Sequence, residues 1–279
     1  METVMMHVTG ARSLGLALAV ALVLLPLGAA RGQSSPSVPP QQIETTLPAS
    51  GADIEPEADR ILRQMTDHLA GLKTFAVTAD AATEVLLRDG RKIQLTATGR
   101  AVVDRKLGFR VERRGPNGLV RVTYDGTRVS LLAEAPNAYA TIEAAGGNDV
   151  ALDELRAVLG TEAAGGVDLL YAQPYEGLLL EVESGEYLGL TWVGGVPAHQ
   201  LSFRAAEIDW QLWVRAEGDP VPVKYVITSK WLAGAPQFSV QLSDWDTGAS
   251  LSAADLAFTP PAGARALDAA ELYELAAGE

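Results

Sequence analysis

Residues 74–104 read TFAVTADAATEVLLRDGRKIQLTATGRAVVD. Asp89-Gly90, near the middle of this stretch, is a dipeptide typical of tight hairpin turns. Apolar and polar side chains alternate on both sides of it with a period of two, which is the spacing of a half-buried strand. The stretch therefore predicts a long antiparallel hairpin with strands over 74–88 and 91–104.

Shorter runs with the same alternation fill most of the remaining chain, and residues that favour turns separate them. On the C-terminal side of the hairpin, four strands are predicted over 108–114, 119–124, 128–133 and 138–143. Further along, six more are predicted over 178–183, 186–193, 197–204, 208–215, 221–229 and 237–244. The total is about eleven or twelve strands.

Helical spacing occurs in front of the first strand and between the two groups of strands. Residues 54–70 place one set of apolar side chains on a single face: Ala58, Ile61, Leu62, Met65 and Leu69. Pro56 suits the first turn of this helix, and Gly71 suits its end. A second helix is predicted over 149–159, and a short third helix over 167–171 that Pro174 ends.

The order of these elements predicts an α+β protein rather than a βαβ alternation, because the helices interrupt a mostly antiparallel series at particular places. A sheet of this size tends to curl or close, since this hides its edges and its apolar face. We expect the helix in front and the helices in the middle to cover the open side.

The first 32 residues have the pattern of a cleavable export signal. An apolar run over 14–25 ends at Pro26, and small residues lead to a cleavage site expected between Gly32 and Gln33. Because the chain contains no cysteine, this is not a lipoprotein signal, which needs a cysteine for the lipid. We expect an exported, periplasmic protein without a membrane anchor.

The remaining boundaries follow from composition. Residues 33–53 are rich in Ser, Pro and Gln and predict a disordered spacer. The folded domain is expected over 54–265. Residues 266–279 are expected to form a tail or a short helix, the helical pattern lying over 268–277.

Composition and missing motifs exclude several classes of protein. The whole chain carries a net charge of −13, and removing the signal (Arg12, Arg31 and Glu2, net +1) leaves −14. Such an acidic protein is repelled by nucleic acid. Without cysteine there is no thiol chemistry. The two histidines after the signal, His68 and His199, lie in different elements and do not predict a metal site.

Catalytic patterns are missing as well. The sequence has no nucleophile elbow and no phosphate-binding or dinucleotide-binding glycine loop. The one suggestive carboxylate pair is Asp209 and Asp244, each followed by Trp, and these are expected to be strand-end residues. The sequence therefore predicts a protein that is not an enzyme and needs no cofactor or metal.

Several motifs occur in a recognisable order: YDGT at 124–127, NAY at 137–139, GVPAHQLSFR at 195–204, DWQLW at 209–213, DW at 244–245 and FTPPAGA at 258–264. Together they resemble an uncharacterised bacterial family of predicted periplasmic proteins. That family is similar to the LolA and LolB lipoprotein carriers and to mycobacterial lipid-carrier lipoproteins. The resemblance covers roughly residues 54–265.

This resemblance implies a curled, half-open antiparallel barrel of about eleven strands. Its helices would plug the mouth, and its apolar interior could hold acyl chains. LolA itself uses an arginine near its start to hold the lid shut. Arg100 and Arg110 lie at loosely comparable places, but neither matches residue by residue, so the role is not assigned to either.

Two functions are therefore expected, and both are non-enzymatic. The first is a carrier that binds an acyl chain or a lipoprotein in the half-barrel. The second is a periplasmic envelope-stress sensor that holds a protein partner through the same fold. The candidate ligand-binding residues come from the front helix and from the strands rich in Trp: Leu62, Met65, Leu69, Trp192, Trp210, Leu212 and Trp231.

Each of these candidates also has a structural interpretation. The apolar face of helix 54–70 is suited to core packing as well as to a lid. The Trp residues are suited to filling the barrel or covering its seam. Within one strand, Trp210 and Leu212 share a face, whereas Gln211 and Trp213 share the other, so one Trp should point inward and one outward.

Overall fold

The structure, a computed structural model, describes residues 51–159 and 166–272. The expected export signal and nearly all of the spacer lie outside these residues. Within them, every strand belongs to one sheet of 13 strands in the order β1-β8-β9-β10-β11-β12-β2-β3-β4-β5-β6-β7-β13.

The chain forms its elements in a simple order. The strands are β1 (Asp53–Ile54), β2 (Thr74–Leu86), β3 (Lys92–Asp104), β4 (Gly108–Gly115), β5 (Gly118–Tyr124), β6 (Arg128–Ala133), β7 (Ala138–Glu143), β8 (Val182–Val193), β9 (Val196–Ala205), β10 (Ile208–Arg215), β11 (Pro222–Ser229), β12 (Gln237–Asp246) and β13 (Arg265–Ala266). The helices are α1 (Pro56–Gly71), α2 (Asn148–Leu159), the 3₁₀ helix η2 (Val167–Leu170), α3 (Pro174–Leu178) and α4 (Ala253–Leu256).

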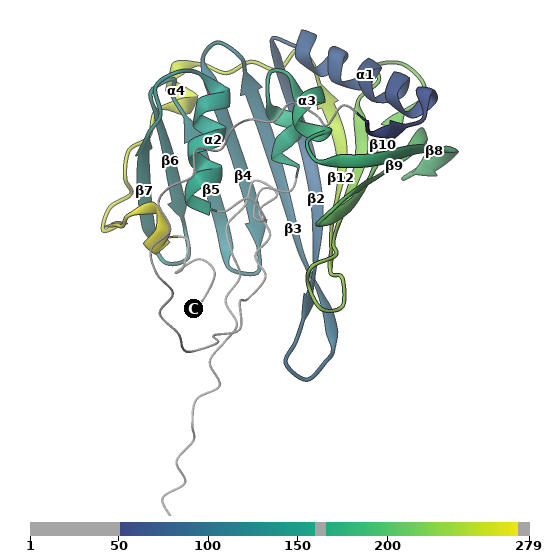
Figure 1. Ribbon diagram of the computed structural model, residues 1–279. Helices are drawn as coiled ribbons and strands as arrows, with labels where there is room; N and C mark the ends of the chain where they lie inside the picture. The colour runs from purple at the N-terminus through teal and green to yellow at the C-terminus, as the bar shows by residue number, and fades with distance from the viewer. Residues whose placement is uncertain (1–50, 160–165, 273–279) are drawn as a thin grey trace, which may run out of the picture.

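The predicted hairpin stands at the centre of the sheet. Strands β2 and β3 pair without a break from Thr74 opposite Asp104 to Leu86 opposite Lys92. Strand β12 pairs with the other side of β2 and so joins the second group of strands to the first. The sheet curls into a half-barrel that does not close (Figure 1). The predicted fold class is confirmed, with 13 strands where about eleven were expected.

The concave face of the half-barrel carries the core. Helices α2 and α3 lie across this side of the sheet, and α1 lies beside α3 above β8 and β10 (Figure 1). Helix α1 starts with Pro56 in its first turn, where acidic side chains favour the positive end of the helix. Its apolar face is buried, and the main core includes Ile61, Leu62, Met65 and Leu69.

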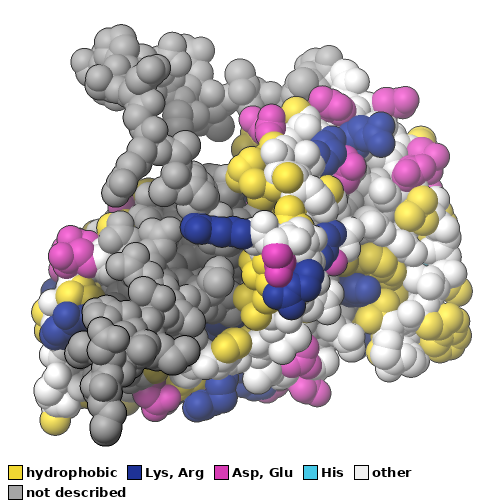
Figure 2. All heavy atoms as spheres, turned by 90° about the horizontal axis from the view of Figure 1, so that it is seen from below, with side chains coloured by type: hydrophobic (Ala, Val, Ile, Leu, Met, Phe, Trp, Pro, Cys, Tyr) yellow, Lys and Arg dark blue, Asp and Glu magenta, His cyan; other side chains and the backbone are white. Residues whose placement is uncertain are grey.

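The two edges of the sheet are covered to different extents. At one edge, β13 pairs with Ala138 and Tyr139 of β7. At the other, β1 pairs only with Ser184 and Gly185 of β8, although β8 is 12 residues long. Figure 2 shows apolar side chains gathered at the right-hand end of the molecule, which is the end that β8 occupies in Figure 1.

The segment between the middle helices and the second group of strands differs from the prediction. The predicted strand over 178–183 is wrong, because α3 continues to Leu178 and β8 begins at Val182. Pro174 starts α3 rather than ending the helix before it. The run Leu178-Leu179-Leu180 misled the prediction, since a short apolar run has no period that separates strand from helix.

Two smaller differences lie near the ends of the domain. Asp53 and Ile54, expected at the boundary between spacer and helix, form β1 beside β8. Of the terminal helix expected over 268–277, residues 269–272 are helical and the rest lie outside the described residues. Ala269 and Leu272 pack into the main core, so the chain beyond 265 still contributes to the fold.

Candidate functional site

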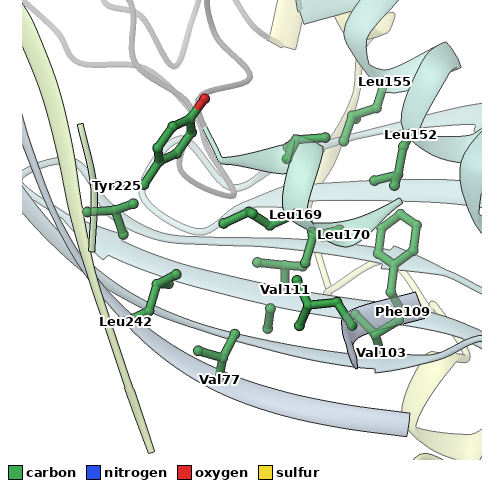
Figure 3. Close-up of a cluster of buried hydrophobic side chains, with 14 of the residues drawn as sticks. Val77, Val103, Phe109, Val111, Leu152, Leu155, Leu169, Leu170, Tyr225 and Leu242 are labelled. Carbon is green, nitrogen blue, oxygen red and sulfur yellow. The ribbon is translucent and has the colours of Figure 1, made fainter. Parts of the chain in front are cut away.

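An apolar cavity of about 60 Å³ lies between the concave face of the sheet and η2. Its floor comes from β2, β3, β4 and β12, and its cover comes from η2. In Figure 3, Leu169 and Leu170 of η2 lie over Val111, with Leu242 and Val77 on the neighbouring strands. The site is therefore a pocket of the half-barrel interior, closed on one side by a single short helix.

The central hairpin contributes a set of small residues to the floor of the cavity. They occupy alternate positions of the central hairpin and face the same side: Ala79, Ala81, Ala97, Gly99 and Ala101. Since β2 and β3 pair Ala79 with Gly99 and Ala81 with Ala97, the small residues stand opposite one another. Space remains here because short side chains from the sheet do not reach the cover.

Position 99 requires glycine for a further reason. A Cβ atom at this position would lie 2.7 Å from the backbone oxygen of Glu112 on β4, which is closer than such atoms approach each other. The close approach of β3 and β4 therefore requires glycine here.

Arg105 ties the cover to the rest of the domain. Its Nη1 donates to the backbone oxygen of Leu170 in η2, and its Nη2 donates to that of Leu69 in α1 at 3.5 Å. The guanidinium also lies 5.4 Å from the centre of the Phe75 ring. Burial lowers the pKa of Arg105. One half-buried cation thus holds η2, α1 and β2 together.

A second polar contact fixes η2 to α2. Arg156 of α2 donates to Asp168 of η2 at 3.0 Å. Burial raises the pKa of Asp168, and the guanidinium of Arg156 opposes that rise. The hydroxyl of Tyr171 donates to Asp153 at 2.7 Å, and burial together with this bond raises the pKa of Tyr171 to about 12. The cover is therefore held by polar bonds as well as by apolar burial.

A charged side chain also lines the cavity. Arg113 of β4 faces the concave side in register with Gly99 and lines the cavity, and burial lowers its pKa. By contrast, the register places Arg100 and Arg110 on the outer face, where Arg110 donates to Glu112. The residue that holds the cover is thus Arg105, which sequence reasoning did not single out.

The candidate residues of α1 lie in the core. Leu62, Met65 and Leu69 are all fully buried against the sheet and its neighbouring helices. None of the three lines the cavity beneath η2. Their role in ligand binding stays a prediction, and their packing role is established.

The candidate residues on the strands are scattered. Trp210 stacks on Phe203 with ring centres 4.0 Å apart, and Leu212 is fully buried beside it. Trp192 and Trp231 are exposed. The predicted alternation is confirmed, because Trp210 belongs to the main core, whereas Trp213 belongs to a second cluster with Val193, Ala198, Val223 and Val226.

The other sequence-predicted residues have local partners. His199 Nδ1 lies 2.9 Å from the hydroxyl of Tyr187. Asp209 pairs with Lys230 and Arg204 on the outer side of the sheet. Among the described residues, no group of three or more His, Asp or Glu is arranged to hold a metal ion.

The cavity residues were missed although the sequence contained a signal for them. The strand period already places Ala79, Ala81, Ala97, Gly99 and Ala101 on one face of the predicted hairpin. Short side chains on the inward face of central strands leave space, unless a large side chain from another element fills it. Large aromatic side chains drew attention instead; of the three Trp candidates, Trp210 fills the core, whereas Trp192 and Trp231 are exposed.

Comparison with known proteins defines the family. Residues 58–269 match the family described as "Predicted periplasmic protein (DUF2092)". The chain belongs to this family. The match confirms the expected family and the periplasmic location, and it covers α1 from Ala58 onward, the whole hairpin and the cavity. A comparison with curated proteins found no match.

Several solved structures are similar to this chain at low sequence identity. Lipoprotein LppX of Mycobacterium tuberculosis is 14% identical, with a TM-score of 0.46, and the match covers 71% of this chain and 100% of that one. An uncharacterised conserved protein of Thermus thermophilus is 15% identical, with a TM-score of 0.45 and coverage of 76% and 99%. A LolA superfamily protein of Nitrosomonas europaea is 11% identical, with a TM-score of 0.35 and coverage of 72% and 97%. Likeness at this level carries no functional argument.

The helices of the described part of the chain were also compared with the requirements of a membrane span. None of them is long and apolar enough to cross a bilayer.

Proposed function

We propose that this protein is a non-enzymatic binding protein of the periplasm that holds an acyl chain, free or attached to a lipoprotein, beneath η2. The observation that carries the proposal is the row of small residues on the inward face of the central hairpin. An acyl chain fits such a floor, because it is thin, apolar and without hydrogen-bonding groups along its length.

Binding requires the cover to move. The cavity of about 60 Å³ is far smaller than the roughly 300–1,000 Å³ of typical ligand pockets. The η2 helix has four residues and contributes Leu169 and Leu170 to the closed site. When η2 lifts, the chain of the ligand replaces these two side chains against the floor. Burial of its apolar surface supplies about 25 cal/mol per Å².

The first test is to purify the exported protein, expected to begin at residue 33, from a bacterial periplasm and to record native mass spectra before and after organic extraction. A co-purifying lipid of defined mass is the expected result, and it would identify the ligand class. An empty protein that also fails to take up a fluorescent fatty acid would contradict the proposal.

A pair of variants assigns the binding site. Ala81→Leu places a larger side chain into the cavity, and we expect fatty-acid affinity to fall at least tenfold, a loss of about 1.4 kcal/mol. Ala82→Leu adds the same atoms to the adjacent residue, whose side chain points to the other face of β2. Equal affinities of the two variants would show that the ligand binds elsewhere.

The second candidate function is a periplasmic sensor that holds a protein partner. It is supported by the exposed apolar side chains on β8, which the cavity does not explain. Affinity capture with the purified protein, followed by identification of one specific envelope protein, distinguishes this function from lipid carriage. Lipid in the cavity together with no specific protein partner would exclude it.

A further inference from the structure

Strand β8 exposes a stripe of large apolar side chains at the edge of the sheet. Leu188, Leu190 and Trp192 are 50%, 59% and 67% exposed. No Asp, Glu, Lys or Arg occurs from 187 to 203, which covers most of the β8–β9 hairpin. Sheet edges in soluble proteins are normally protected by charge, by proline or by a covering segment. An uncharged apolar edge of this length therefore indicates an interaction surface.

The backbone of this edge is also open. The backbone N–H of Glu55 donates to the oxygen of Gly185 at 2.9 Å, and the N–H of Tyr187 donates to the Glu55 carboxylate at 3.0 Å. Beyond Tyr187, no strand of the described residues pairs with the outer side of β8. A partner strand could continue from the point where β1 and Glu55 stop.

The side chains are spaced for recognition of an extended segment. Leu190 lies opposite His199, and Trp192 lies opposite Pro197, so both point to one face. A bulge at Tyr187–Gly189 precedes them, with Gly189 at φ 106°. Added strands gain affinity from main-chain hydrogen bonds and specificity from contacts at alternate side chains. The β8 edge provides both kinds of contact.

The surrounding charges define the chemistry of the partner. Glu183 and Glu186 are exposed on β8 itself, and the Glu55 carboxylate lies at the end of the open edge. Arg60, which interacts electrostatically with Tyr187, is already paired with Glu57. A membrane is a poor occupant, because the whole chain carries −13 and anionic lipid surfaces repel it.

We propose that the 187–193 edge of β8 binds an extended segment of a partner protein that adds to the sheet as a strand and alternates apolar residues with Lys or Arg. This interaction is independent of lipid binding, since β8 contributes no residue to the cavity beneath η2.

The test uses fluorescent ten-residue peptides that alternate Leu or Val with Lys. One control series replaces Lys with Glu, and another is N-methylated at every second residue, so that one of its edges cannot donate hydrogen bonds. We expect the Lys series to bind at least tenfold more tightly than either control. Hydrogen exchange of the amides over 188–193 should slow when the peptide is bound.

Protein variants locate the contact. The double variant Leu190→Ser/Trp192→Ser should weaken peptide binding at least tenfold. Leu180→Ser removes another leucine that is 54% exposed but precedes β8, and it should leave binding unchanged. If the double variant fails to fold, the exchange pattern of the unaltered protein with the N-methylated peptides still tests the proposal.

Four results would overturn the proposal. The first two are no binding by any Lys peptide at about 1 mM and equal binding by the N-methylated series. The third is binding of the protein to vesicles of phosphatidylcholine or phosphatidylglycerol through Leu190 and Trp192, and the fourth is a dimer in sedimentation that the double variant abolishes. The third result would assign the edge to a membrane, and the fourth to a second copy of this chain.

Discussion

The concave face of the sheet differs between the part beneath α1 and the part beneath η2. Beneath α1, the sheet contributes large side chains such as Phe203 and Trp210, which are buried with exposures of 2% or less. Beneath η2, the central hairpin contributes small residues such as Ala81 and Gly99, and a cavity remains. The same sheet therefore forms a packed core at one place and a candidate binding site at another, depending on how far its side chains reach.

The largest expected effect on stability concerns the packed core beneath α1. Leu69→Ala removes a fully buried side chain of α1, and we expect a loss of about 2–5 kcal/mol in the free energy of unfolding. Gln64→Ala on the exposed side of the same helix should change it by less than about 0.5 kcal/mol. Urea unfolding measures both. A loss below about 1 kcal/mol for Leu69→Ala would mean that α1 is loosely attached and is itself a cover.

The next effect concerns Arg105, which contacts both α1 and η2. Arg105→Met keeps most of the apolar stem but leaves the oxygens of Leu170 and Leu69 without this donor. We expect a loss of about 1–3 kcal/mol in unfolding free energy and faster hydrogen exchange in η2. Arg100→Met, on the exposed outer face, serves as the control. Unchanged exchange in η2 would show that Arg105 does not hold the cover.

Gly99 tests the floor of the cavity. Gly99→Ala brings a Cβ atom within 2.7 Å of the Glu112 oxygen, so β3 and β4 must separate slightly. We expect a loss of about 1–3 kcal/mol from this overpacking. In Gly71→Ala, the added atom meets nothing within 4 Å, and stability should be kept or slightly raised. If Gly99→Ala unfolds at the same urea concentration as the unaltered protein, the floor is more adaptable than its geometry indicates.

The smallest effect is a pH dependence of the contact between α1 and α3. Asp59 accepts hydrogen bonds from the hydroxyl of Tyr175 and from Arg63. Burial raises the pKa of Asp59, but these bonds outweigh it and hold the pKa below the ordinary value of 3.8. A carboxyl group whose pKa is lower in the folded state stabilises the fold above about pH 4. This contribution is lost as the pH falls through the folded-state pKa.

Asp59→Asn should therefore cost about 0.5–1 kcal/mol at pH 7 and flatten the decline in stability below pH 4. The exposed Asp67→Asn, on the same helix, provides the comparison. Urea unfolding between pH 2 and pH 7 records both effects. An identical acid decline in Asp59→Asn and in the unaltered protein would show that this bond does not attach α1 to α3 in solution.

The sequence by itself determined the fold class and nearly all the strands. The alternation around Asp89-Gly90 defined the central hairpin, because a period of two with one buried face fixes the register of a strand pair. The helical face of Ile61, Leu62, Met65 and Leu69 was likewise evident from spacing. These signals are local, so they can be read without knowledge of the partners. The prediction of a strand over 178–183 was wrong because this apolar run has no periodicity that separates a strand from a helix.

The tertiary structure alone decided which of the inward-facing side chains form a site. Trp210 and Ala81 both face the concave side, but Trp210 meets Phe203 and Tyr225, whereas Ala81 lies in the cavity wall. Arg105 likewise acquires its role from Leu170, which lies 65 positions away in the chain. Whether an inward-facing side chain fills the core or lines a cavity depends on the side chains that lie opposite it. Those side chains come from distant segments of the chain, which only folding brings close.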